Sequence, residues 1–239
     1  MNNAHAHDDR QSEQQNGQQG ELREFRALLH AQRVWDLDRL PAFAPAAAPA
    51  EPLPLFHRWF AEAVAAGQTE PHTMTLATVD EQGRPDVRTL MLHDADGQGW
   101  HFASHATSAK GRQLAASPEA ALGFYWPAQA RQIRVRGTVS AAGATESQAD
   151  LHARSTGALA AALTGRQSER LGSLEELAKT SQAAWERAQA EPEAAVPTWT
   201  RYTVDPYEVE FFQGDVQRRH VRLRYRREAG VWASELLWP

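Results

Sequence analysis

A stretch near the C-terminus concentrates side chains that bind anions and transfer protons. Residues 213–225 read QGDVQRRHVRLRY, and a β-strand would alternate these side chains between two faces. One face would be apolar, and the other would carry Arg218, His220, Arg222 and Arg224. Guanidinium groups about 6 to 7 Å apart repel unless water or an anion lies over them. The pattern therefore predicts either a solvated edge strand or a site for an anion or polar ring, in which His220 titrates near neutrality.

Further anion-binding and amide side chains are spread over the rest of the chain. They include Arg88, Lys110, Gln132, Arg154 and Gln167. Arginine and lysine suit phosphate, whereas amides suit a heterocycle with both donors and acceptors. The set as a whole predicts a site for a phosphorylated ring compound.

Other kinds of site lack their sequence signals. There is no cysteine, which excludes disulfides, a thiol nucleophile and thiolate metal ligands. Phosphate-loop, dinucleotide-binding, zinc-protease and serine-hydrolase motifs are missing. Ordinary polar roles are expected for the scattered histidines, and a solvated tail is favoured over a metal site for His5 and His7 beside Asp8 and Asp9. We expect no metal site.

Composition indicates an ordinary soluble protein. The chain has 239 residues, 42% of them apolar and 23% charged, with a net charge of -5. It has no apolar run of 18 residues and no apolar signal-peptide core in its first 20 residues. We expect a cytoplasmic protein that binds a small molecule and neither nucleic acid nor membrane.

The helices and strands expected to position these residues follow a polar N-terminal segment. Residues 1–20 are too polar to offset the entropy of ordering and predict a disordered tail. Apolar spacing predicts a helix over 21–35, and an Ala/Pro-rich linker extends to residue 52. The segment 21–52 would therefore precede a domain over 53–239.

That domain mixes helices with short strands. Helices are predicted over 55–67, 108–116, 145–162 and 173–191. Strands are predicted over 73–79, 85–93, 100–104, 120–126, 131–139, 199–212, 213–225 and 230–237. Antiparallel strands in this number, with inserted helices, predict an α+β, barrel-like domain rather than alternating β-α units.

Several motifs occur in a characteristic order. They are TMTLATVD from Thr73, Gly83-x-Pro85, Arg88 before an apolar strand, Phe102 to Lys110, Arg131-Gln132, Arg166-Gln167-Ser168, and EFFQG from Glu210 with Arg218-x-His220-x-Arg222. Together they resemble the pyridoxamine 5'-phosphate oxidase family over about residues 50–239. The resemblance includes the C-terminal dimerisation region, here 197–239.

The resemblance implies an antiparallel split β-barrel with flanking helices, paired as a homodimer with FMN at the subunit interface. It also implies oxidation of pyridoxine or pyridoxamine 5'-phosphate to pyridoxal 5'-phosphate, with O2 reduced to H2O2. The flavin would supply the redox chemistry, and the protein would supply position and electrostatics.

The same resemblance assigns roles to individual residues. Those holding the FMN phosphate and its tail would be Arg88, Ser104, Lys110, Gln167 and Ser168. Those bordering the isoalloxazine would be Gln132, Phe212 and Arg222. Arg218 and His220 would be catalytic and lie against the substrate ring, while His93 and Arg154 would complete the substrate site.

The chain departs from the family at the expected substrate-phosphate ligands. Where the family has Lys, Tyr and Ser, this chain has His93, Asp150 and Ala158, and only Arg154 remains. A carboxylate repels a phosphate dianion, and a neutral histidine does not replace a lysine. Two alternatives therefore stay open: a phenazine-biosynthesis-type FMN oxidase acting on a non-phosphorylated reduced ring, and a non-catalytic FMN-binding protein.

Overall fold

The computed structural model describes residues 19–32, 35 and 40–239. The chain divides into two compact units, Met1–Asp38 and Arg39–Pro239. In the first unit, residues 19–31 form a helix, so the helix predicted over 21–35 is confirmed over 21–31 and ends earlier than expected. The expected tail, apart from residues 19 and 20, and the histidines at its start lie outside the described residues.

The second unit is built on one antiparallel sheet. Its strands are β1 (Thr73–Val79), β2 (Pro85–Met91), β3 (Asp94–Asp96), β4 (Gly99–His105), β5 (Glu119–Trp126), β6 (Arg131–Ala141), β7 (Trp199–Gln213), β8 (Val221–Glu228) and β9 (Val231–Leu237). The order is β2-β1-β5-β6-β7-β4-β3, and a second branch leads from β7 through β8 to β9. β7 pairs with β4 along its first residues and with β8 along its last. This long strand therefore connects the two ends of the sheet.

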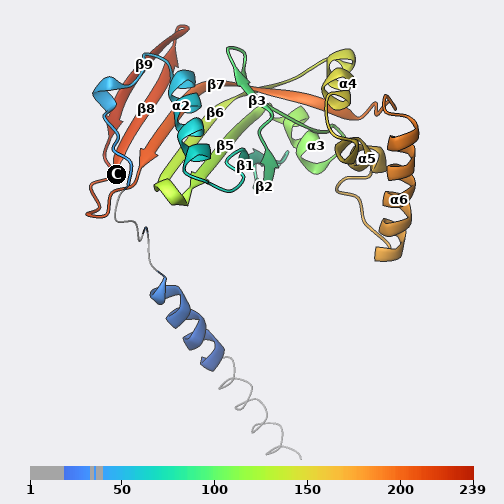
Figure 1. Cartoon of the computed structure of the whole chain (residues 1–239), viewed down its shortest axis with the longest axis horizontal. Coiled ribbons are helices and arrows are strands. Elements are labelled where there is room, and N and C mark those ends of the chain that lie inside the picture. The colour runs from blue at the N-terminus through green and yellow to red at the C-terminus, as the bar shows by residue number, and fades with distance from the viewer. Residues whose placement is uncertain (1–18, 33–34, 36–39) are drawn as a thin grey trace, which may run out of the picture. The chain divides into compact units, whose positions relative to one another are not determined.

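Helices flank the sheet at two places. They are α2 (Pro52–Ala65), α3 (Ala109–Ala116), α4 (Ala144–His152), α5 (Thr156–Thr164) and α6 (Leu174–Ala190), with short 3-10 turns η1 (Pro45–Ala47) and η2 (Pro127–Gln129). Figure 1 shows α4, α5 and α6 gathered at one end of this unit and β8 and β9 at the other. The two branches of the sheet thus place helices and strands at opposite ends of β7.

The core lies between α2 and the sheet. Leu55, Phe56 and Trp59 of α2 are buried among strand residues. On β6, Ile133 and Val135 are buried while Arg134 between them faces outward, because side chains alternate along a strand. The Phe56 ring lies 5.2 Å from Phe124 in an edge-on contact. The sheet therefore buries one face and leaves the other for polar side chains.

The segment before α2 is also packed on this core. The Phe43 ring lies edge-on to Trp59 with centroids 5.0 Å apart. The Tyr225 hydroxyl donates to the Pro49 carbonyl oxygen at 2.8 Å. Residues without sequence periodicity can thus be ordered by contacts that only the folded chain provides.

Two predicted elements are wrong in extent. The helix expected over 145–162 is two helices, because the Ser155 side chain accepts from the Ala158 N–H and begins α5 there. The strand expected over 213–225 begins only at Val221. Arg218 and His220 precede that strand, and the φ of +65° at Arg218 places it in the left-handed region.

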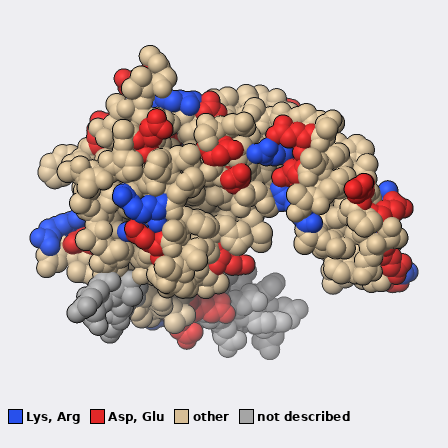
Figure 2. All heavy atoms as spheres, turned by 45° about the horizontal axis from the view of Figure 1, so that its top comes forward, with Lys and Arg blue, Asp and Glu red and all other residues tan. Residues whose placement is uncertain are grey.

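No helix in the described residues is long and apolar enough to cross a membrane. Charges of both signs are mixed on the surface. On the face seen in Figure 2, Lys and Arg lie beside Asp and Glu, without a broad patch of one sign over the described atoms.

Candidate functional site

The structure places the predicted site residues in three groups. The phosphate cluster comprises Arg88, Ser104, Lys110, Gln167 and Ser168. The strand row comprises Gln132, Phe212 and Arg222, next to a loop that carries Arg218 and His220. The arginine-carboxylate cluster comprises His93, Asp150, Arg154 and Trp199.

Lys110 is the centre of the phosphate cluster. The Ser108 side chain caps α3 by accepting from the Gly111 N–H at 3.2 Å, which fixes the first turn that carries Lys110. The Lys110 ammonium donates to Ser104 Oγ at 3.1 Å and to Gln167 Oε1 at 3.0 Å. Ser168 Oγ accepts from the Ala109 N–H at 3.1 Å. A strand, a helix start and the loop before α6 therefore meet at this amine.

Arg88 approaches the same region from β2. Its guanidinium donates to Thr78 Oγ1 at 2.6 Å and to Gln113 Oε1 at 3.0 Å. It also pairs with Asp86 at 2.6 Å, and the Asp86 side chain is half exposed. Two cations thus lie close enough that the charge of Arg88 is felt at Lys110.

The ammonium of Lys110 is buried with only neutral hydrogen-bond partners. Its side chain is 6% exposed, and its hydrogen bonds within the described chain go to hydroxyl and amide oxygens. Burial, and then the nearby Arg88 charge, lower the pKa of Lys110, and the nearby Asp86 carboxylate opposes them only in part. An anion bound here would give the ammonium a directly bonded negative partner. The donors therefore fit a phosphate group such as that of FMN.

A cavity of about 480 Å³ opens beside this cluster. Ser104 and Gln167 line it from the phosphate cluster, while Leu90, Ala158 and Trp199 line it from β2, α5 and β7. The size and mixed lining are those of a small-molecule site.

The strand row lies across three neighbouring strands. Gln132 of β6 is opposite Phe212 of β7, which in turn is opposite Arg222 of β8. Directly opposite residues share one face of a sheet, so an amide, an aromatic ring and a guanidinium lie in one line. Such a line offers stacking and hydrogen bonding to one edge of a planar ring.

Glu210 orients Arg222, the cation of this row, and also bonds Arg134. It is 3% exposed and accepts from Arg222 Nε at 2.7 Å and from Arg134. Burial opposes ionisation, but hydrogen bonds from Arg222 and Arg134 prevail and lower the pKa of Glu210. The carboxylate therefore stays charged and holds Arg222 in place.

The loop before β8 brings His220 against the row. The rings of Phe212 and His220 have centroids 5.2 Å apart. The Asp215 backbone N–H donates to His220 Nδ1 at 3.0 Å, and the Arg218 N–H donates to the Asp215 carbonyl. A tight turn, rather than strand alternation, thus positions both expected catalytic residues.

The arginine-carboxylate cluster is internally paired. Arg154 donates to Asp150 through Nε at 3.0 Å and through Nη2 at 2.8 Å, and Nη1 donates to the His93 ring. The Trp199 Nε1–H donates to Asp150 Oδ2 at 3.1 Å, and the guanidinium carbon lies 5.2 Å from the Trp199 ring centroid. Sequence reasoning flagged Asp150 only as a replaced ligand, although its i,i+4 spacing from Arg154 signals a helical pair.

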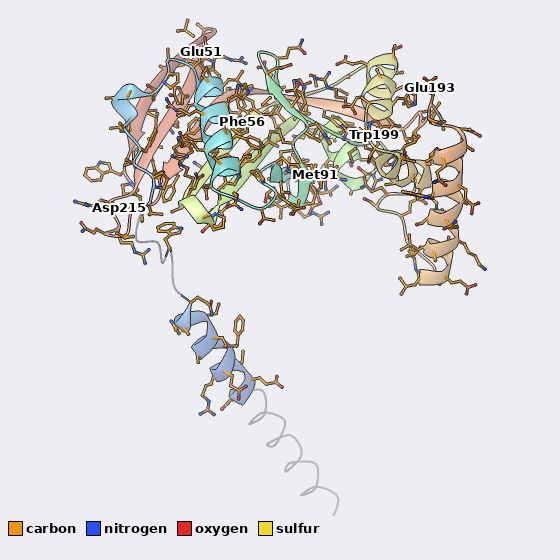
Figure 3. The ribbon with its side chains drawn as sticks, viewed as in Figure 1. Glu51, Phe56, Met91, Glu193, Trp199 and Asp215 are labelled. Atoms are coloured by element: carbon orange, nitrogen blue, oxygen red, sulfur yellow. The ribbon has the colours of Figure 1, made fainter. Side chains whose placement is uncertain are left out.

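These groups do not converge within one chain. Trp199 begins β7 and Phe212 lies near its end, and a strand of this length spans roughly 40 Å. In Figure 3, Asp215 is labelled at the left and Trp199 toward the right, next to the helices on that side. The arginine-carboxylate and phosphate clusters lie near one end, and the strand row lies near the other.

Comparison with known proteins shows to which family this chain is related. Residues 60–188 match the family described as pyridoxamine 5'-phosphate oxidase. The chain belongs to this family. Residues 199–239 match the family's C-terminal dimerisation region, described as that of pyridoxine 5'-phosphate oxidase.

Curated relatives with similar names span most of the chain. A pyridoxine/pyridoxamine 5'-phosphate oxidase from Pseudomonas putida (strain GB-1) is 42% identical over 82% of this chain and 92% of its own length. One from Pseudomonas paraeruginosa (strain DSM 24068 / PA7) is also 42% identical, over 89% of this chain and 99% of its own length.

Two solved structures share the fold. PhzG from Burkholderia lata 383, in complex with tetrahydrophenazine-1-carboxylic acid, has a TM-score of 0.77 and 29% identity over 84% of this chain and 99% of that chain. An FMN-binding protein related to pyridoxamine 5'-phosphate oxidase from Nostoc punctiforme has a TM-score of 0.64 and 22% identity, over 82% of this chain and 100% of that chain. The predicted α+β split barrel is therefore confirmed.

Proposed function

We propose that this protein is an FMN-dependent oxidase that converts pyridoxine or pyridoxamine 5'-phosphate to pyridoxal 5'-phosphate, with O2 reduced to H2O2. The observation that carries the proposal is the buried Lys110 ammonium, which has neutral partners and an adjacent arginine, in a chain of this family. The 42% identity to curated oxidases over most of the chain supports the same activity. The proposed oxidase domain is 53–239, and its proposed location is the cytoplasm.

FMN would supply hydride acceptance and reoxidation by O2. The phosphate cluster would hold its phosphate through charge-assisted hydrogen bonds. The strand row would border its ring system, and Glu210 would keep Arg222 directed there. Arg218 and His220 would orient the substrate, and His93 and Arg154 would contact its far end.

A homodimer with FMN at the interface is part of the proposal. Because the phosphate cluster and the strand row lie near opposite ends of β7, a complete site would combine the first from one chain with the second from its partner. A two-fold interface makes two such sites at once. The dimerisation region at residues 199–239 supports this arrangement.

Mixed dimers would test the shared site. Lys110→Met and Arg222→Met subunits, each defective in FMN binding alone, would form hybrids in which one site carries both changes and the other carries neither. We expect one FMN per hybrid dimer, measured by flavin absorbance after tandem-tag purification. Hybrids that bind no more FMN than the parents would place each site within one chain.

A second candidate is oxidation of a non-phosphorylated reduced ring. The bidentate pairing of Arg154 with Asp150 favours it, since an arginine already bound to a carboxylate is a poor phosphate ligand. The 29% identity to PhzG gives it a structural relative.

The deciding experiment follows the flavin under anaerobic conditions. Pyridoxine 5'-phosphate should bleach the visible band of the FMN-loaded protein and yield pyridoxal 5'-phosphate. A band that stays oxidised with every vitamin B6 compound would contradict the proposed function and favour the second candidate.

A further inference from the structure

We propose that Asp150 determines substrate selectivity: by holding Arg154, it removes the preference for a phosphate dianion, so that the site also accepts pyridine substrates without a phosphate. The inference rests on the proposed function and names the substrate class of that site. For pyridoxine the reaction is balanced, because two electrons and two protons pass from the 4' alcohol to O2 and give the aldehyde and H2O2.

Most donors of Arg154 are already used. Its Nε and Nη2 contact both oxygens of Asp150 at 2.8 to 3.0 Å, and its Nη1 contacts the His93 ring. A phosphate could bind Arg154 fully only by displacing the carboxylate. Otherwise it would bind beside the carboxylate and be repelled by it.

The carboxylate is itself held in place. Trp199 Nε1–H donates to Asp150 Oδ2 at 3.1 Å, and the Trp199 ring lies near the guanidinium. The side chains of Arg154 and Asp150 are only 12% and 16% exposed, so water and salt screen their attraction weakly. A phosphate that displaced the Asp150 carboxylate would therefore have to break its hydrogen bonds with Arg154 and with Trp199.

Histidine does not add a positive charge to the cluster. His93 is exposed to solvent on one side, yet partial burial of its ring and the Arg154 guanidinium lower its pKa to about 4. At neutral pH the cluster therefore holds one positive charge, one negative charge and a neutral ring. Because its net charge is zero, the cluster does not favour a dianion over an uncharged substituent.

Two arginines line the adjacent cavity: Arg170 is exposed to solvent, and Arg166 is paired with carboxylates. Arg166, which lines this cavity, pairs with Glu169 at 3.0 Å and with Glu176 at 2.7 Å. Leu90, Ala158 and Leu177 contribute apolar surface to the lining. Surroundings of this kind suit a ring with an uncharged substituent.

The test compares Asp150→Asn with the wild type, both loaded with FMN. Asparagine keeps the shape and can still accept from Trp199, but it removes the charge that opposes a phosphate. Glu146→Gln, one turn earlier on α4, is the matched control, because Glu146 pairs with Arg201 rather than Arg154. Binding of pyridoxal 5'-phosphate and of pyridoxal is measured by flavin fluorescence, and kcat and KM are measured for pyridoxine with and without its phosphate.

We expect Asp150→Asn to bind pyridoxal 5'-phosphate at least about tenfold more tightly, with pyridoxal unchanged, as removal of one like charge near an anion predicts. The wild type and Glu146→Gln should oxidise pyridoxine and its phosphate with kcat/KM values within about tenfold of each other. The proposal would be overturned if Asp150→Asn bound pyridoxal 5'-phosphate no more tightly than the wild type does. It would also be overturned if the wild type strongly preferred the phosphorylated substrate.

Binding separates this inference from the proposed function. If neither variant oxidises any vitamin B6 compound, the proposed function fails. The change in pyridoxal 5'-phosphate affinity between wild type and Asp150→Asn then still supports or contradicts the role of Asp150, because it needs no turnover.

Discussion

Two cations in this protein, the buried Lys110 and the partly buried Arg154, have opposite surroundings. Lys110 donates to hydroxyl and amide oxygens of the described chain, whereas Arg154 is bound by both oxygens of Asp150. No carboxylate is hydrogen-bonded to Lys110 in the described chain, whereas one is already bonded to Arg154. The difference indicates that the phosphate cluster is prepared for an anionic ligand, while the arginine-carboxylate cluster is satisfied by the chain itself.

The contrast between the two cations would not hold if Lys110 only stabilised the fold and bound no anion. Lys110→Met should weaken FMN binding by about 1.5 to 3 kcal/mol, the range for hydrogen bonds to charged groups. It should also leave the FMN-free protein as stable or more stable, because a buried charge is removed. Fluorescence titration with FMN and urea unfolding check the two effects.

Lys179→Met is the control, since Lys179 is exposed and pairs with Glu175 on the surface of α6. Equal FMN affinity of Lys110→Met and wild type would contradict an anion site at Lys110.

On the other side of the comparison, Arg154→Met should cost about 2 kcal/mol of unfolding free energy. Asp150 would remain largely buried with Trp199 as its donor, although its residual 16% exposure reduces the cost below that of a fully buried charge. The double variant with Asp150→Asn should recover most of the loss. Urea unfolding of both variants gives the result.

Arg201→Met serves for reference, because its partner Glu146 is half exposed and the pair should contribute under about 1 kcal/mol. Equal costs for the Arg154 and Arg201 changes would show that pairing with Asp150 has no special value.

The smallest effect concerns pH. The folded pKa of His93 is about 4, below its ordinary value of 6.5, so the unfolded chain binds more protons between these values. Stability from the neutral His93 is therefore present above about pH 6.5 and is lost as the pH falls toward about 4. His93→Asn should lose less stability than wild type between pH 7 and pH 5, as measured by urea unfolding at both values. Parallel pH profiles of the two proteins would argue against a neutral His93.

The sequence predicted strands better than it predicted interruptions. The expected strand over 73–79 coincides with β1, because apolar alternation and turn residues bound it on both sides. The break at Ser155 was missed, since an alanine-rich segment keeps its helical pattern across it. The turn at Asp215 was missed as well. Its side chain accepts from the Gln217 and Arg219 N–H groups, and this local bond outweighs strand alternation.

Site residues and their division into an FMN-phosphate group and a ring group could be proposed from motif order and family resemblance, but the geometry within each group could not. The row of Gln132, Phe212 and Arg222 depends on strand register, which spacing along one chain does not give. The role of Glu210 was also out of reach, because its partners come from β6 and β8. Assignments of individual residues to FMN and substrate stay predictions.

The length of β7 sets a limit on how this protein can diverge. A loop can gain residues at little cost, since its ends stay where the sheet holds them. Two residues added inside β7 would keep every side chain on its own face, yet they would move one end of the strand by roughly 7 Å relative to the other. β7 already carries one extra residue opposite Arg136 and Gly137, and a Cβ added at Gly137 would be 2.3 Å from the Asp205 carbonyl oxygen, so the two strands are closely packed at this irregularity. Mutational insertion scans should therefore find β7 intolerant of even pattern-preserving changes in length.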